Sequence, residues 1–228
     1  MEEYNIQVDI HEACRYMGCP IDADTSVQTA VKNAAALIEK TSVPRVITKI
    51  CDIDKTNGIY LKGTGLQLSG KAIASLLHNC EQCAIFCATI GSEFEALIRK
   101  WQLKDLAFAT MLDACASSAV ESLCDSVEAA LARDFGAQGY YLTDRFSPGY
   151  GDLPLSIQPD FCAALDTTRK IGVSISESGI MIPRKTVTAV IGFSKYPQKH
   201  IQTGCSGCSL SADCKFRENG VTCYGQAI

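Results

Sequence analysis

The sequence predicts an α+β protein in which helices pack on a mixed or antiparallel sheet. Short β-branched segments such as 45–53 are typical of strands, while longer stretches with apolar residues at helical spacing predict helices. The two kinds of segment do not alternate regularly, as the units of a parallel sheet would. With 228 residues and 47% hydrophobic content, the chain can bury one sizeable core. We expect one domain over residues 1–197 and a polar, cysteine-rich tail over 198–228.

The N-terminal third predicts two helices followed by strands. A short helix over 9–17 ends at Gly18, and a longer one begins at Thr25, where Thr25-x-x-Gln28 fits a capping box, and stops before Pro44. Residues 45–53 then predict a strand. The Asn57-Gly58 pair indicates a tight turn between strands.

The rest of the chain mixes both kinds of element. We expect helices over 70–78, from Ser92 to about Trp101, over about 105–135 and near 158–168, and strands at 83–91, 171–175 and 185–194. The helix over 105–135 is the longest and is rich in small residues.

Charge and composition exclude several classes of function. The net charge is −4 and no block of Lys or Arg stands out, which argues against a nucleic-acid partner. The N-terminal stretch has no apolar core like that of a secretory signal, and the apolar runs are short for a membrane span, so we expect a soluble, cytoplasmic protein. The 13 cysteines then predict buried thiols or metal ligands rather than a disulfide framework.

The segment RFSPGYGDLPLSIQ, residues 145–158, combines residue types that suit a ligand. Arg145 presents a planar fork of donors that matches a carboxylate or phosphate. Gly149 and Gly151 let backbone approach a ligand and leave peptide groups available, and Tyr150 offers a flat face to a ring. The alternative is a surface turn with an arginine salt bridge and a tyrosine packed on the core.

This segment and three others resemble the activation domain of cobalamin-dependent methionine synthase. The family motif R-x-x-x-G-Y reads here as Arg145-x-x-x-Gly149-Tyr150, and a later family stretch reads as IGVSISESGIMIPRKTVTAVIGF at 171–193. The stretches ATIGSEFEALIRKW and MLDACASSAVESLCDSVEAAL are also similar to the family. The resemblance covers roughly residues 80 to 195, and it implies the fold of that domain.

The resemblance also implies an activity. Such domains bind S-adenosylmethionine and use its methyl, with one electron from a reductase, to remethylate a cobalamin that has become inactive. It implies that Arg145 pairs with the ligand carboxylate and that Tyr150 and the Ser147 to Gly151 backbone hold the adenosine end. The implied S-adenosylmethionine-binding residues are Arg145, Ser147, Gly149, Tyr150, Glu121 and Glu177.

The two glutamates have plainer readings as well. Asp113, Ser117, Glu121 and Asp125 recur every four residues on one helix face, which is usually solvated. Glu177 also fits an ordinary charge at a strand end.

The chain departs from the family in two places. A glutamate that often precedes the family arginine is absent, and 139–141 reads Gly-Tyr-Tyr. The cobalamin-binding signature D-x-H-x-x-G is also missing, because Asp9-x-His11 is followed by Cys14 in place of glycine. We therefore expect a partner to carry the cobalamin, namely a corrinoid methyltransferase such as a methionine synthase that lacks its own activation domain. We also expect a separate electron donor, and we expect no membrane partner.

The tail carries cysteines at metal-ligand spacing. Cys205, Cys208, Cys214 and Cys223 form C-x2-C-x5-C-x8-C, which favours a four-thiolate site for zinc or an iron–sulfur cluster. A cluster would supply a low-potential electron for cobalt, and we favour it on that ground. An iron–sulfur electron-transfer protein for corrinoid proteins without S-adenosylmethionine chemistry is therefore the alternative function, and a scaffold that caps a corrinoid protein is a third. The run Cys80-x2-Cys83-x3-Cys87 predicts buried packing instead.

Overall fold

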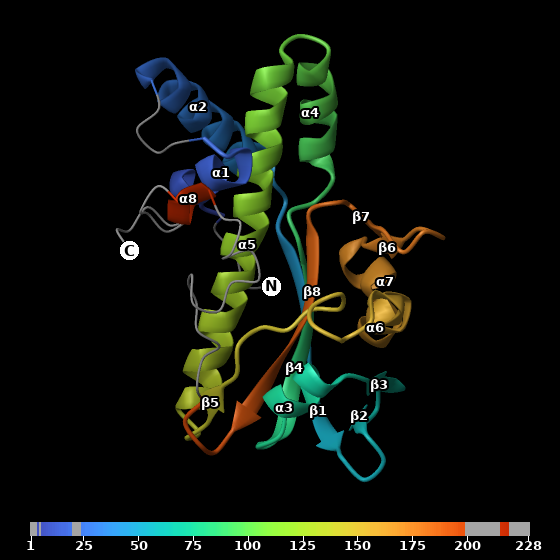
Figure 1. Cartoon of the computed structure of the whole chain (residues 1–228). Coiled ribbons are helices and arrows are strands. Elements are labelled where there is room, and N and C mark those ends of the chain that lie inside the picture. Colours follow the sequence, from blue (N-terminus) through green and yellow to red (C-terminus); the bar gives the residue numbers. More distant parts are fainter. Residues whose placement is uncertain (1–3, 5, 20–23, 199–214, 219–228) are drawn as a thin grey trace. The chain divides into compact units, whose positions relative to one another are not determined.

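The computed structural model describes residues 4, 6–19, 24–198 and 215–218 (Figure 1). These residues form two compact units, one from 4, 43–92 and 123–198 and the other from 6–19, 24–42, 93–122 and 215–218. Helix α5 (Leu106–Gly136) contributes its first part to the second unit and its last part to the first. The predicted boundary between 1–197 and a tail over 198–228 stays a prediction, because most of the tail lies outside the described residues.

The first unit is built on a six-stranded sheet in the order β3-β2-β1-β4-β8-β5. Every neighbouring pair in it is antiparallel. The strands are β1 (Arg45–Asp54), β2 (Ile59–Leu61), β3 (Leu66–Leu68), β4 (Cys80–Thr89), β5 (Tyr141–Leu142) and β8 (Thr186–Ser194). A separate hairpin pairs β6 (Ser174–Ile175) with β7 (Met181–Ile182). The predicted α+β class with an antiparallel sheet is confirmed.

One face of this sheet carries the main core of the first unit. Alternate side chains of β4, including Cys83, Ile85 and Cys87, belong to one buried cluster with Phe161 of helix α6 and Ile171 of helix α7. Helices α6 (Gln158–Leu165) and α7 (Thr167–Ile171) lie along this side of the sheet in Figure 1. A 3-10 turn, η1 (Leu155–Ile157), leads into them, and helix α3 (Lys71–Leu76) precedes β4.

The opposite face of β8 meets the end of helix α5. The ring of Phe135 stacks on that of Phe193 with centroids 3.8 Å apart and planes 11° from parallel. The neighbouring Gly192 points the other way, where a Cβ atom would lie 2.6 Å from both Cys80 Sγ and Leu77 Cδ2. This strand therefore needs a glycine at 192, because there is no room for a side chain.

The second unit is helical. It contains α1 (Ile10–Met17), α2 (Thr25–Thr41), α4 (Glu93–Gln102), the first part of α5 and α8 (Lys215–Glu218). The predicted end of α1 at Gly18 is confirmed, since Gly18 adopts the left-handed conformation with φ +64°. The predicted cap of α2 is wrong by one residue: the Asp24 side chain accepts a hydrogen bond from Ser26 N, so Asp24 and not Thr25 is the N-cap.

Helix α5 is the one helix, among those described, that is long and apolar enough by composition to cross a membrane. Half of its most apolar 18-residue stretch is buried inside the protein. Core helices of soluble proteins show the same pattern.

Candidate functional site

The central turn, defined here as residues 145–153, is anchored in the core at its first end. Phe146 forms an isolated antiparallel bridge with Val190 of β8, with N···O distances of 3.0 and 2.9 Å. The Phe146 ring belongs to the buried cluster of the first unit. Leu153, at the far end, is also buried there. The turn is thus held at both ends by apolar burial.

The far end is tied to helix α3 as well. The Asp152 carboxylate accepts hydrogen bonds from the backbone N–H groups of Lys71 and Ala72, the latter at 3.0 Å. These bonds lower the pKa of Asp152 from its usual 3.8, since they favour the charged form. Gly70 lies directly beneath, where a Cβ atom would come 2.5 Å from an Asp152 carboxylate oxygen. Asp152 is therefore a structural cap.

Between these anchors the chain makes a tight, internally bonded turn. Gly149 N donates to Leu153 O at 2.9 Å, Tyr150 N to Ser147 O at 3.1 Å, and Leu153 N to Tyr150 O at 3.0 Å. The expectation that glycines leave peptide N–H groups available is therefore wrong for Gly149. Gly149 has φ +91° and Gly151 has φ +53°, conformations that favour glycine.

The Tyr150 side chain faces solvent, with 66% of its surface exposed. The plainer interpretation of this segment placed the tyrosine on the core, and the structure does not support that part. Tyr150 is available as a flat surface at the crest of the turn.

Arg145 forms an ion pair, as the plainer interpretation of the segment expected. Its Nη1 lies 2.8 Å from Asp125 Oδ1 and 3.9 Å from Glu128 Oε2, both on α5. Asp125 and Glu128 are three residues apart, so they share one helix face. The exposed fraction of the side chain is 22% for Arg145 and 70% for Asp125. The guanidinium is thus held in place while its main partner faces solvent.

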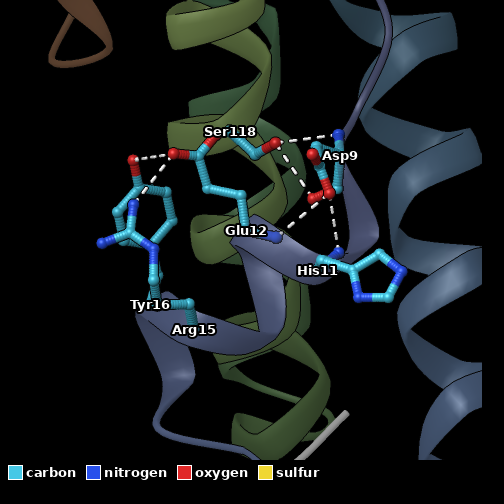
Figure 2. Close-up of polar contacts among 6 residues, drawn as sticks. All are labelled: Asp9, His11, Glu12, Arg15, Tyr16 and Ser118. Atoms are coloured by element: carbon cyan, nitrogen blue, oxygen red, sulfur yellow. Dashed lines mark hydrogen bonds and ion pairs between the residues drawn. The ribbon is translucent and has the colours of Figure 1, made fainter. Parts of the chain in front are cut away.

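Glu121, also on α5, belongs to the second unit and lies near helix α1. Burial, and then the charges of Glu12 and Glu121, raise the pKa of the Tyr16 hydroxyl. Glu12 accepts hydrogen bonds from Arg15 Nη2 at 2.9 Å and from the Tyr16 hydroxyl at 3.1 Å (Figure 2). Glu121 is half-buried beside this polar cluster, so the stripe that contains it is not uniformly solvated.

Asp9 and His11, which begin like a cobalamin signature, start helix α1. Asp9 Oδ1 accepts from the backbone N–H of His11 at 2.8 Å and of Glu12 at 3.1 Å (Figure 2). The Ser118 hydroxyl accepts a hydrogen bond from the backbone N–H of Asp9 at 2.9 Å and donates one to the backbone carbonyl of Asp9 at 3.1 Å. The carboxylate of Asp9 acts as an N-cap.

Glu177 belongs to another segment, the exposed turn of the β6–β7 hairpin. That hairpin turn is held locally, by Ser176 N bonding Ile180 O at 2.9 Å and Gly179 N bonding Ser176 O at 2.9 Å. No hydrogen bond or ion pair between described residues joins Glu177 to the central turn. The central turn therefore contains four of the six predicted residues, which are near neighbours in sequence: Arg145, Ser147, Gly149 and Tyr150.

Sequence reasoning missed a buried polar residue at the end of the quoted segment. Gln158 is 2% exposed, and its Nε2 donates to Thr188 Oγ1 at 2.6 Å and lies 3.3 Å from Met181 Sδ. These contacts connect the segment after the turn to β8 and β7. A lone glutamine at the head of an apolar helix was the only sequence signal.

The metal ligands predicted in the tail, Cys205, Cys208, Cys214 and Cys223, lie outside the described residues. Within the described part of the chain, no group of three His, Cys, Asp or Glu side chains is close enough to hold a metal. Cys80, Cys83 and Cys87 are fully buried, and burial raises the pKa of the Cys80 thiol to about 11. The prediction of buried packing for these three is confirmed.

Comparison with known proteins adds a likeness of fold. No family model matches the chain, and no curated protein matches it in sequence. Among solved structures, it is similar to the MetH reactivation domain bound to AdoHcy, with a TM-score of 0.59 and 15% sequence identity. The alignment covers 92% of this chain and 77% of that chain. The fold is therefore that of the MetH reactivation domain.

Proposed function

We propose that this protein is a cytoplasmic module that binds S-adenosylmethionine and remethylates the cobalamin of a partner corrinoid methyltransferase. The sequence resemblance favours a methionine synthase as that partner. The observation that carries the proposal is the likeness of fold, over 92% of the chain, to a reactivation domain bound to AdoHcy. AdoHcy is what S-adenosylmethionine becomes when it loses its methyl. The sequence motifs around Arg145 support the same ligand.

The central turn supplies the binding groups in this proposal. Arg145 is always charged and offers several N–H donors, so it can bind a ligand carboxylate beside or in place of Asp125. Tyr150 offers its exposed ring to the adenine, at the crest of a turn that Phe146 and Asp152 anchor to β8 and α3. Ser147 and Gly149 shape the backbone of that crest. Glu121 and Glu177 stay predictions of the family resemblance, and Glu177 is the weaker of the two because its side chain is exposed in the β6–β7 hairpin.

The chemistry needs little beyond positioning. S-adenosylmethionine carries a methyl group already activated by the sulfonium, and the sulfur keeps the bonding electron pair when that methyl leaves. The one electron that inactive cobalamin requires comes from a separate donor. The protein must hold the methyl in line with the cobalt and keep water away.

The tail belongs to the proposal as a metal site. Cys205, Cys208, Cys214 and Cys223 would bind an iron–sulfur cluster or zinc through four thiolates. Metal analysis and an absorption spectrum of anaerobically purified protein test this, beside the double variant Cys205→Ser/Cys208→Ser. We expect stoichiometric metal that the double variant loses. Protein that binds neither iron nor zinc would refute the site, and zinc without visible absorption would refute the cluster.

Calorimetric titration with S-adenosylmethionine tests the main proposal. Arg145→Ala removes a charge-assisted contact, so we expect binding weaker by about ten- to a hundredfold. Arg169→Ala is the matched control, because Arg169 is an exposed arginine in an ion pair with Asp166 in the same unit. Wild type that does not bind S-adenosylmethionine, or a loss that is equal in both variants, would contradict the proposal.

A further inference from the structure

Arg145 lies beside two acidic side chains, and their charges bear on which ligand the site prefers. One guanidinium lies within ion-pair distance of two carboxylates, at 2.8 Å from Asp125 and 3.9 Å from Glu128. The three groups together carry a net negative charge. A site that only captured a carboxylate would be better served by the arginine alone, because the two acidic side chains repel an incoming anion.

Exposure distinguishes the members of this cluster. Arg145 is mostly covered, whereas Asp125 is 70% exposed and Glu128 is 35% exposed. An exposed carboxylate exchanges its partner for water at little cost, since surface ion pairs contribute little stability. Asp125 is thus the member that can turn from Arg145 toward a bound ligand.

The proposed ligand and its product differ in one charge at sulfur. S-adenosylmethionine has a carboxylate, an ammonium group and a sulfonium, and is a net cation. AdoHcy has a neutral thioether and is a zwitterion without net charge. A cluster with net negative charge attracts the first more strongly than the second.

On the basis of the proposed function, we propose that Asp125, assisted by Glu128, is a specificity-determining residue that makes the site prefer the cationic ligand over its neutral product. Before the ligand binds, Asp125 neutralises Arg145. When the ligand carboxylate pairs with Arg145, the charge of Asp125 turns to the cationic part of the ligand. Transfer of the methyl removes that cation, so the product binds more weakly and leaves.

The test is a pair of calorimetric titrations, with S-adenosylmethionine and with AdoHcy, on the full chain. The variants are Asp125→Asn and Glu128→Gln, and the control is Asp134→Asn, an exposed carboxylate farther along α5 in the same unit. The measured quantity is the ratio of the two dissociation constants, AdoHcy over S-adenosylmethionine. A ratio is insensitive to a general loss of folded protein.

We expect Asp125→Asn to lower this ratio by about two- to fivefold at low salt, the size of one exposed charge interaction. Binding of AdoHcy should tighten, because Arg145 loses a competing carboxylate. Glu128→Gln should lower the ratio less, and Asp134→Asn should leave it unchanged. Added salt should reduce the difference between wild type and Asp125→Asn.

The outcomes separate this inference from the function on which it rests. If wild type binds neither ligand, both fall. If wild type binds S-adenosylmethionine through Arg145 but Asp125→Asn keeps the wild-type ratio, the inference is overturned and the proposed function stands. A change in the ratio that Asp134→Asn reproduces would also overturn the inference, because it would reflect only overall charge.

Discussion

The central turn and the β6–β7 hairpin both carry residues of the family resemblance, but the first unit holds them very differently. The central turn joins the core through Phe146 and Leu153 and caps helix α3 with Asp152. The hairpin turn is closed mainly by its own short-range bonds, and Glu177 stands exposed in it. Side chains on an anchored segment lose less conformational entropy when they bind a ligand, so Arg145 and Tyr150 are the stronger candidates for binding.

The largest expected effect comes from removing the anchor of the central turn. Phe146→Ala deletes a buried ring from the core, and we expect the free energy of unfolding to fall by about 3–5 kcal/mol. Ile180→Ala in the hairpin, where the side chain is 56% exposed, should change it by about 0.5 kcal/mol or less. Urea unfolding measures both, and equal losses would refute the contrast between the two regions.

The next effect concerns the crest of the turn. Tyr150→Ala should weaken S-adenosylmethionine binding by about two- to tenfold, the worth of one aromatic contact, while leaving stability unchanged because the ring is exposed. Tyr150→Phe keeps the ring and should restore most of the affinity. Titration calorimetry measures the affinity of both variants. Wild-type affinity in Tyr150→Ala would show that Tyr150 does not contact the ligand.

A smaller effect comes from Asp152, through pH. Its pKa is lowered in the folded protein, so the stability it contributes is present above the usual 3.8 and is lost as the pH falls through the folded value. Asp152→Asn should therefore be less stable than wild type near about pH 6, and the difference should shrink toward about pH 3. Urea unfolding across this range tests it; a gap that is constant with pH would mean that the charge of Asp152 contributes nothing.

The smallest effect is expected at Glu177. Glu177→Gln in the hairpin should leave the dissociation constant for S-adenosylmethionine within about twofold of wild type, because exposed charges contribute little. The free energy of unfolding should also stay close to the wild-type value. Loss of affinity as large as that of Arg145→Ala would reverse the ranking of the two regions. The hairpin would then have to contact the ligand directly.

The predictions that succeeded rest on local patterns. The strand at 45–53 is β1, the turn at Asn57-Gly58 precedes β2, the long helix over 105–135 is α5, and the end of α1 at Gly18 is set by one left-handed glycine. The short strands β5 and β7 were missed. Each has two residues, too few for a periodic pattern, and each exists because a neighbouring strand offers it hydrogen bonds.

The sequence by itself determined the fold class and the residue types of the candidate site, because strand and helix propensities, apolar periodicity and turn glycines act over a few neighbouring residues. Only the tertiary structure decided how those residues are used. It made Asp152 a helix cap across 81 residues, brought Asp125 to Arg145 across 20, and buried Gln158 against Thr188. Such pairings depend on which distant groups the packed sheet brings within hydrogen-bond distance of each other. No local sequence pattern determines which residues those are.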